Sequence, residues 1–169
     1  MNISLSGLDG SLKFFLISFL IALTIGVLVG LAYLNYTTDY SSEGAIERFK
    51  GSEVEVLTDE FDIPETYAKT ISEMLITTHN HVIGFSLIFL PVGLIFYFNS
   101  IITGPLKKFL IVEPFFSTVI SFGSLWLVRF VSNEFIYLTI ISAVLIYSSY
   151  FLMTGISLYE LMFKRQTGE

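Results

Sequence analysis

The chain contains no cysteine, and its charged residues are sparse. Aspartate, glutamate, lysine and arginine make up 14% of the 169 residues, and histidine occurs twice. The absence of cysteine excludes disulfide bonds, thiolate chemistry and sulfur-ligated metal sites. The nine lysine and arginine residues do not form the basic cluster that nucleic-acid binding requires, so no nucleic-acid partner is expected.

Hydrophobic sequence is what the chain has in abundance. Hydrophobic residues make up 53% of it, and the mean hydropathy is +0.73, which is typical of a polytopic membrane protein. Each of four apolar runs can cross about 30 Å of hydrocarbon as a helix. They are residues 14–34, 82–98, 109–131 and 135–157. We predict an all-α membrane protein, a single domain over residues 1–169 whose four-transmembrane-helix bundle contacts the lipid bilayer.

The basic residues predict how the bundle is oriented. Five of the nine fall on one side of the predicted membrane, which the positive-inside rule makes cytoplasmic. These are Lys13, Lys107, Lys108, Lys164 and Arg165. With four spans, both termini are then cytoplasmic.

The segment between the first two spans, residues 35–81, lies on the other side. It contains ten acidic and three basic residues, a net charge of −7. It is too small for a core of its own, so we predict a small extracytoplasmic lid packed on the outer ends of the spans. Ser41 or Ser42 is expected to cap a short helix, Glu43 to Lys50, which Gly51 ends.

A longer helix is predicted to begin at Asp62 and to continue through the second span to Asn99. Asp62 is a capping residue, Pro64 suits a first helical turn, and Glu65 completes a capping-box spacing.

Both histidines, His79 and His81, fall where this helix enters the apolar run. On a helix they diverge by about 200°, so they cannot chelate one ion together. One ring could bind a haem or a metal ion as a single ligand, could pack against the bundle, or could make a pH-sensitive contact with a partner. His79 shares a face with Ser86 and Gly93, and small residues mark the packed side of a membrane helix, which favours His79 for an inward role.

Small residues recur every four positions along the first span, at Ser18, Ala22, Gly26 and Gly30. Such a stripe lets two helix backbones approach closely in lipid. It predicts helix packing, either inside the bundle, in a homodimer, or against another membrane subunit.

The third span contains two ionisable residues, Glu113 and Arg129. They are 16 residues apart, about 24 Å along a helix, so they cannot pair with each other. Arg129 can snorkel to Glu134 or lipid phosphate, or contact an acid of the lid such as Glu73. Glu113 either lies inside the helix, bonded to Ser or Tyr of another span, or precedes a helix that begins at Pro114.

Two stretches resemble features of a known group of proteins. Gly44–Gly51 (Gly-Ala-Ile-Glu-Arg-Phe-Lys-Gly) resembles a glycine-aromatic-basic-glycine loop, and Thr78–His81 (Thr-His-Asn-His) resembles the second mark of that group. With four spans, the chain is similar to a group of small bacterial inner-membrane proteins of unassigned activity. That group often has histidine where Arg48 stands here, so no metal role is implied for this loop.

No catalytic constellation emerges from the sequence. There is no nucleophile elbow, phosphate loop or paired metal ligand. The first hypothesis is therefore a non-enzymatic accessory subunit of a bacterial inner-membrane complex. The second is a haem- or metal-binding redox protein that uses His79 or His81, and the third is a small transporter that uses Glu113.

Overall fold

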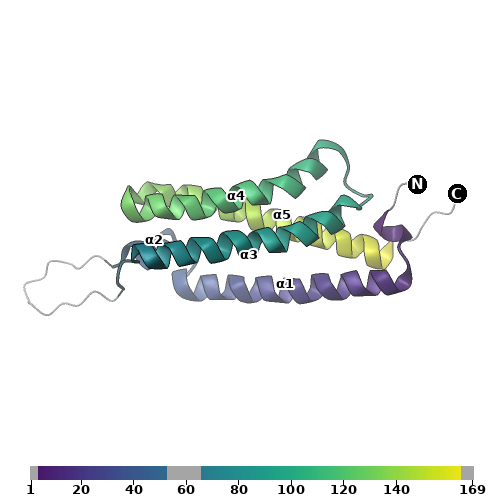
Figure 1. Ribbon diagram of the computed structural model, residues 1–169, viewed down its shortest axis with the longest axis horizontal. Coiled ribbons are helices and arrows are strands. Elements are labelled where there is room, and N and C mark those ends of the chain that lie inside the picture. Colours follow the sequence, from purple (N-terminus) through teal and green to yellow (C-terminus); the bar gives the residue numbers. More distant parts are fainter. Residues whose placement is uncertain (1–3, 53–65, 165–169) are drawn as a thin grey trace, which may run out of the picture.

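The computed structural model describes residues 4–52 and 66–164, which form long helices joined by short turns. The elements are η1 (Leu5–Gly7), α1 (Gly10–Thr38), α2 (Ser42–Lys50), α3 (Ile71–Tyr97), α4 (Gly104–Phe130), η2 (Asn133–Phe135) and α5 (Ile136–Phe163). The four long helices run side by side (Figure 1). The short helix α2 lies at one end of the bundle, here called the lid end, and η1 lies at the other, here called the η1 end.

Four helices in the described part of the chain are long and apolar enough to cross a membrane, which confirms the predicted four-span bundle. Helix α1 includes its predicted apolar run, and each of the other three is one residue short of its run at one end and extends beyond it at the other. Helix α1 begins at Gly10 because the Asp9 carboxylate accepts hydrogen bonds from Ser11 N (2.9 Å) and Leu12 N (3.1 Å). It ends at Asp39, whose left-handed backbone (φ 49°) turns the chain toward α2.

The core lies between α3, α4 and α5, with one edge of α1 added. Its fully buried side chains are mainly large and apolar, and include Phe89 and Phe96 of α3, Tyr150 and Met153 of α5, and Leu20 of α1. Aromatic side chains make the contact between α3 and α4, where Phe89 lies 6.3 Å from Phe115, centroid to centroid.

The predicted short helix is confirmed as α2. Its N-cap is Ser41, whose hydroxyl accepts a hydrogen bond from Gly44 N at 2.9 Å, and its C-cap is Gly51. Gly44 packs on the backbone carbonyl of Thr38 with no room for a side chain. Gly51 has φ 88°, which glycine adopts without strain. Phe49 packs with Met74 of α3 and Leu125 of α4, so α2 covers one end of the bundle as a lid.

The start of α3 differs from the prediction. Asp62, Pro64 and Glu65 lie outside the described residues, and residues 66–70 are not helical. Helix α3 begins at Ile71, after a capping box between Thr70 and Glu73. The preceding residues bond to the end of α2 instead: Ser52 N donates to Thr66 O (2.9 Å) and Lys69 N to Phe49 O (3.0 Å).

Candidate functional site

Three hydrogen bonds lie at the lid end, one of which joins α4 directly to α3. Arg129 Nε donates to Lys69 O at 3.0 Å, Trp126 Nε1 donates to Thr78 Oγ1 at 2.9 Å, and Lys50 Nζ donates to Asn133 Oδ1 at 2.8 Å. Arg129 therefore contacts the segment that leads from the lid into α3, through a backbone carbonyl and not through the Glu73 carboxylate considered from the sequence.

The two histidines have different surroundings. Both side chains are exposed, but the His81 ring also stacks on Phe122 of α4, with centroids 4.7 Å apart. The contact with a neighbouring helix is therefore made by His81, and the inward role predicted for His79 has no contact of this kind to support it. Of the small residues on the His79 face, Gly93 is buried against Ile111 of α4, but it lies about four turns from His79, where aromatic side chains contribute to the contact between α3 and α4.

A hydrogen bond fixes the tautomer of the His81 ring. Its Nδ1 lies 2.7 Å from the carbonyl oxygen of Thr77. A carbonyl oxygen can only accept, so Nδ1 carries the hydrogen and, in the neutral ring, Nε2 keeps its lone pair. His81 thus presents an acceptor nitrogen at the point where α3 enters the apolar part of the bundle.

A groove of about 360 Å³ runs along the bundle beside His81. Small residues of two helices form part of its lining: Ala22, Gly26 and Gly30 on α1 and Gly84 on α3. Asn80 and His81 lie towards the lid end, and larger side chains complete the lining, namely Leu23, Val27, Phe85, Ile88 and Tyr147 of α5. A Cβ atom added at Gly26, Gly30 or Gly84 would meet no atom within 4 Å among the described residues. The groove therefore has free space beside these three glycines, where no side chain covers the helix backbone.

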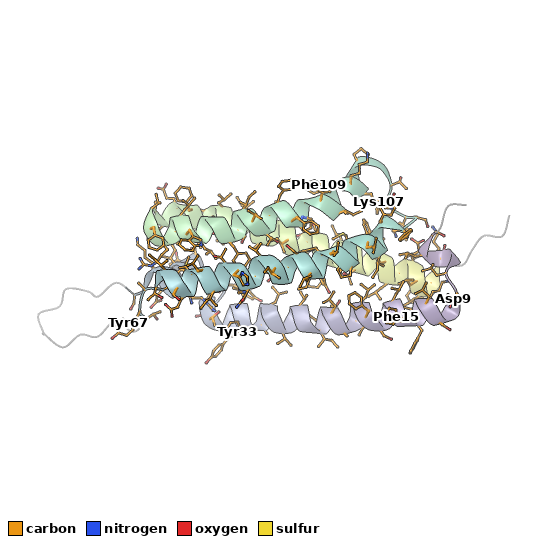
Figure 2. All side chains as sticks on the ribbon, viewed as in Figure 1. Asp9, Phe15, Tyr33, Tyr67, Lys107 and Phe109 are labelled. Atoms are coloured by element: carbon orange, nitrogen blue, oxygen red, sulfur yellow. The ribbon has the colours of Figure 1, made fainter. Side chains whose placement is uncertain are left out.

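The stripe predicted for helix packing forms one wall of this groove and makes no close helix contact in the described chain. Ser18, Ala22, Gly26 and Gly30 are all exposed. Helix α1 contacts α5 through other residues: Leu20 is fully buried, and Thr24 Oγ1 lies 3.0 Å from Tyr150 OH. Figure 2 shows Phe15 and Tyr33 of α1 pointing away from the bundle.

Glu113 lies inside α4, as the first of the two alternatives requires, because α4 begins nine residues earlier at Gly104. The side chain is buried, and Ser149 Oγ of α5 donates to its Oε2 at 2.7 Å. Its Oε1 accepts from Ser117 Oγ, one turn further along α4. Glu113 is therefore part of the contact between α4 and α5.

Among the described residues, the carboxylate with the most hydrogen bonds is one that the sequence did not single out. Glu160 of α5 is fully buried. Its Oε1 accepts from Ser100 Oγ (2.6 Å) and Ser6 N (3.3 Å), and its Oε2 accepts from Asn99 Nδ2 (2.7 Å) and Ser100 N (2.8 Å). One carboxylate thus joins the η1 segment, the turn between α3 and α4, and α5. The signal in the sequence is an acid within an apolar helical run, which in membrane helices is normally bonded.

The described residues do not form a multidentate metal site. No three His, Cys, Asp or Glu side chains among them are grouped closely enough to hold an ion. A metal at His81 would therefore not find three such ligands in this part of the chain.

Comparison with known proteins places the chain at the level of a family. The family model Aq_1264_TM, described as a transmembrane helical domain, matches residues 39–168. No curated protein and no solved structure shows significant similarity to the chain. The matched range begins at the left-handed Asp39 that ends α1, so it contains α2 to α5 and omits α1. Because the match covers well over half of the chain, the protein belongs to the family of the Aq_1264_TM transmembrane helical domain.

Proposed function

We propose that the protein is a non-enzymatic accessory subunit of a membrane complex, and that it holds a transmembrane helix of another subunit in the groove between α1 and α3. The observation that carries the proposal is the glycine lining of that groove. Gly26 and Gly30 on one wall and Gly84 on the other have no atom of the described chain within 4 Å of a Cβ position.

The physics of helix association in lipid supports a helix as the occupant. Lipid tails are as apolar as leucine, so membrane helices associate through close packing and hydrogen bonds and gain little from burying apolar area. Glycine and alanine serve this purpose because they let backbones approach. A wall that faced only lipid would be equally well solvated by leucine. Exposed glycines also occur at Gly123 and Gly155, so the support for a partner backbone is that Gly26, Gly30 and Gly84 line one groove.

The polar end of the groove specifies the partner further. Asn80 and His81 line it towards the lid end. The His81 Nε2 lone pair and the Asn80 amide call for hydrogen-bonding partners near the membrane boundary. We therefore propose a partner helix that is apolar along the groove and has a polar side chain at the level of Asn80.

Leucine variants test this proposal, because the groove has room for the new side chains. Gly26→Leu and Gly84→Leu should reduce recovery of the partner from membranes by tenfold or more, on the order of 1.4 kcal/mol of lost binding, while the isolated protein keeps its thermal stability. Gly155→Leu is the matched control, because Gly155 of α5 is also exposed with no atom of the described chain within 4 Å.

Site-specific crosslinking identifies the occupant directly. A photoreactive phenylalanine analogue in place of Ala22 should crosslink a different membrane protein, and the same analogue in place of the lipid-facing Val144 should not. A crosslink only to a second copy of this chain, or full partner recovery in both groove variants, would contradict the proposal.

His81 supports a second candidate function, a single-ligand haem or metal site. The bond from Nδ1 to the Thr77 carbonyl leaves Nε2 available, and ligating histidines usually donate their other N–H in this way. Purified protein should then absorb in the Soret region or contain a stoichiometric metal, and His81→Ala should lose this signal while His79→Ala keeps it. Protein from haem- and metal-replete cells that shows neither signal would contradict this candidate.

Glu113 favours a packing role over a transport role. Both of its carboxyl oxygens accept hydrogen bonds from serines at the contact between α4 and α5. We therefore assign Glu113 to helix association, and the transporter hypothesis has no further support from its surroundings.

We also propose that the η1 end faces the cytoplasm of a bacterium and the lid end faces the periplasm. The support is the distribution of basic residues, with Lys13, Lys107, Lys108 and Lys164 at the η1 end. Since the chain lacks cysteine, a thiol reagent can label a single-cysteine variant only at the introduced position, and the labelling shows on which side of the membrane that position lies. An impermeant thiol reagent on intact inner-membrane vesicles of known orientation should label Glu43→Cys from the periplasmic side and Lys108→Cys from the cytoplasmic side. The reverse pattern would invert the topology.

A further inference from the structure

Three lysines from three helices gather around the buried Glu160 carboxylate at the η1 end. Each donates a hydrogen bond to one of the residues that bind Glu160. Lys13 Nζ donates to Ser6 O (2.7 Å), Lys107 Nζ to Asn99 O (2.6 Å), and Lys164 Nζ to Ser100 Oγ (2.8 Å). The two turns that hold Glu160 thus also hold the ammonium groups.

Each of these lysines bonds to a neutral oxygen and has N–H donors left for another partner. The Glu160 oxygens already accept four hydrogen bonds from Ser6, Asn99 and Ser100, and the lysines bond to carbonyl and hydroxyl oxygens instead. An ammonium group has three N–H donors, so each lysine has two donors left. Lys107 and Lys164 bond to two consecutive residues of one turn, Asn99 and Ser100.

We propose that Lys107 and Lys164, with Lys13 adding charge, bind the phosphate of an anionic membrane lipid. The cluster lies where three candidate spans end, which is the level of the lipid headgroups. Figure 2 shows Lys107 at the beginning of α4, at the same end of the bundle as Asp9. The side chains are already held by the turns, so binding costs less conformational entropy than it would at free lysines.

Neighbouring apolar side chains favour a lipid over free phosphate. Lys107 Nζ lies 5.7 Å from the centroid of the Tyr97 ring, and Tyr97 is 63% exposed. Tyrosine is typical of the headgroup boundary. Leu106, next to Lys107, is 53% exposed and offers a surface for the first part of an acyl chain. Phosphate and chain together match a phosphatidylglycerol-type lipid.

Lipid titrations of the full chain in neutral detergent test the proposal. Short-chain phosphatidylglycerol should raise the melting temperature, while phosphatidylcholine of the same chain length and inorganic phosphate at equal concentration should not. Lys107→Gln and Lys164→Gln should each weaken phosphatidylglycerol binding about fivefold, as expected for one basic group at an anionic headgroup. Lys108→Gln is the matched control, since Lys108 is exposed and its substitution removes the same charge one residue away.

Other outcomes would overturn the proposal. An equal loss in Lys108→Gln would show diffuse attraction of surface charge, and equal effects of the two lipids would show that no anionic site exists. Competition by inorganic phosphate at the affinity of the lipid would make it a free-phosphate site. If Lys107→Gln disturbs the turn at Asn99, Lys107→Arg provides the second variant: it keeps the charge and should keep binding, and loss of binding in a folded Lys107→Arg protein would contradict the proposal.

Discussion

Helices α4 and α1 represent two ways in which a helix can belong to a membrane bundle. In the most apolar 18-residue stretch of α4, 44% of the residues are buried, against 6% in the corresponding stretch of α1. Helix α4 packs along α5, with which it overlaps in Figure 1, whereas the contacts of α1 are mainly with α2 and with α5. Helix α1 touches the core through one edge that includes Leu20 and Thr24.

The difference does not come from small residues alone, because both helices have them. On α4 the buried small residues include Ser117, Ser121 and Ser124, on the side where α4 meets α5 (the seam). Ser117 bonds to Glu113 of α4, and Ser124 bonds to Thr139 of α5. On α1 they are Ala22, Gly26 and Gly30, and they line an open groove. Hydroxyl groups close the α4–α5 contact within the chain, whereas the backbone surface of α1 is left for a contact outside it.

The largest effect is expected at Glu160, which holds the η1 end of α5 to two turns. Glu160→Leu leaves Ser6 N, Ser100 N and the Asn99 amide without their acceptor, so the free energy of unfolding should fall by about 3–5 kcal/mol. Denaturant titration in mixed micelles measures the change. Glu160→Gln keeps the shape and one acceptor oxygen, so its free energy of unfolding should fall less. A fall below about 1 kcal/mol for Glu160→Leu, close to that of a surface substitution, would show that other contacts hold the turns.

A smaller effect is expected from wedging α4 and α5 apart. Ser121 is buried in the seam, and Ser121→Leu should lower the free energy of unfolding by about 1–3 kcal/mol because the larger side chain has no space. Gly123, two residues away, is exposed with no atom of the described chain within 4 Å, so Gly123→Leu is the control and should change little. Equal stability of the two variants would mean that α4 and α5 separate more easily than their contact suggests.

The smallest effect is expected where α1 bonds to α5. The bond between Thr24 and Tyr150 should contribute about 0.6 kcal/mol, the average for side-chain hydrogen bonds between membrane helices. A double-mutant cycle of Thr24→Val and Tyr150→Phe measures the coupling energy. A coupling above about 2 kcal/mol would contradict the view of α1 as loosely attached, because it would exceed the largest such values measured in membrane proteins.

Local patterns were sufficient to predict the helices of this protein but not their polar contacts. The four spans follow from apolar run length, and α2 follows from a serine cap and a terminal glycine within eleven residues. The bonds of Glu160 join it to Asn99 and Ser6, which are 61 and 154 residues away. No local pattern encodes such a contact, so the sequence did not single out Glu160.

Two further features could not be predicted from the sequence: the residue at which α3 begins, and which of the two histidines contacts α4. The sequence contains two capping-box spacings, Asp62 with Glu65 and Thr70 with Glu73, and propensity does not distinguish them. Bonds from residues 66 and 69 to the end of α2 keep that segment extended and leave Thr70 as the cap. For the histidines, helical geometry predicted that the rings diverge, but which ring meets α4 depends on Phe122, a residue 41 positions from His81.

The bond between Glu113 and Ser149 also constrains how the chain enters the membrane. An acidic side chain carried alone into hydrocarbon costs a few kcal/mol, about 3 at the centre of a helix on insertion scales. Its partner in α5 is synthesised 36 residues later, after the turn at residues 131–135. Helices α4 and α5 are therefore expected to leave the insertion machinery together as a hairpin. Helix α1 has no acidic or basic residue between Lys13 and Asp39, so it can partition into lipid alone while the rest is still being made.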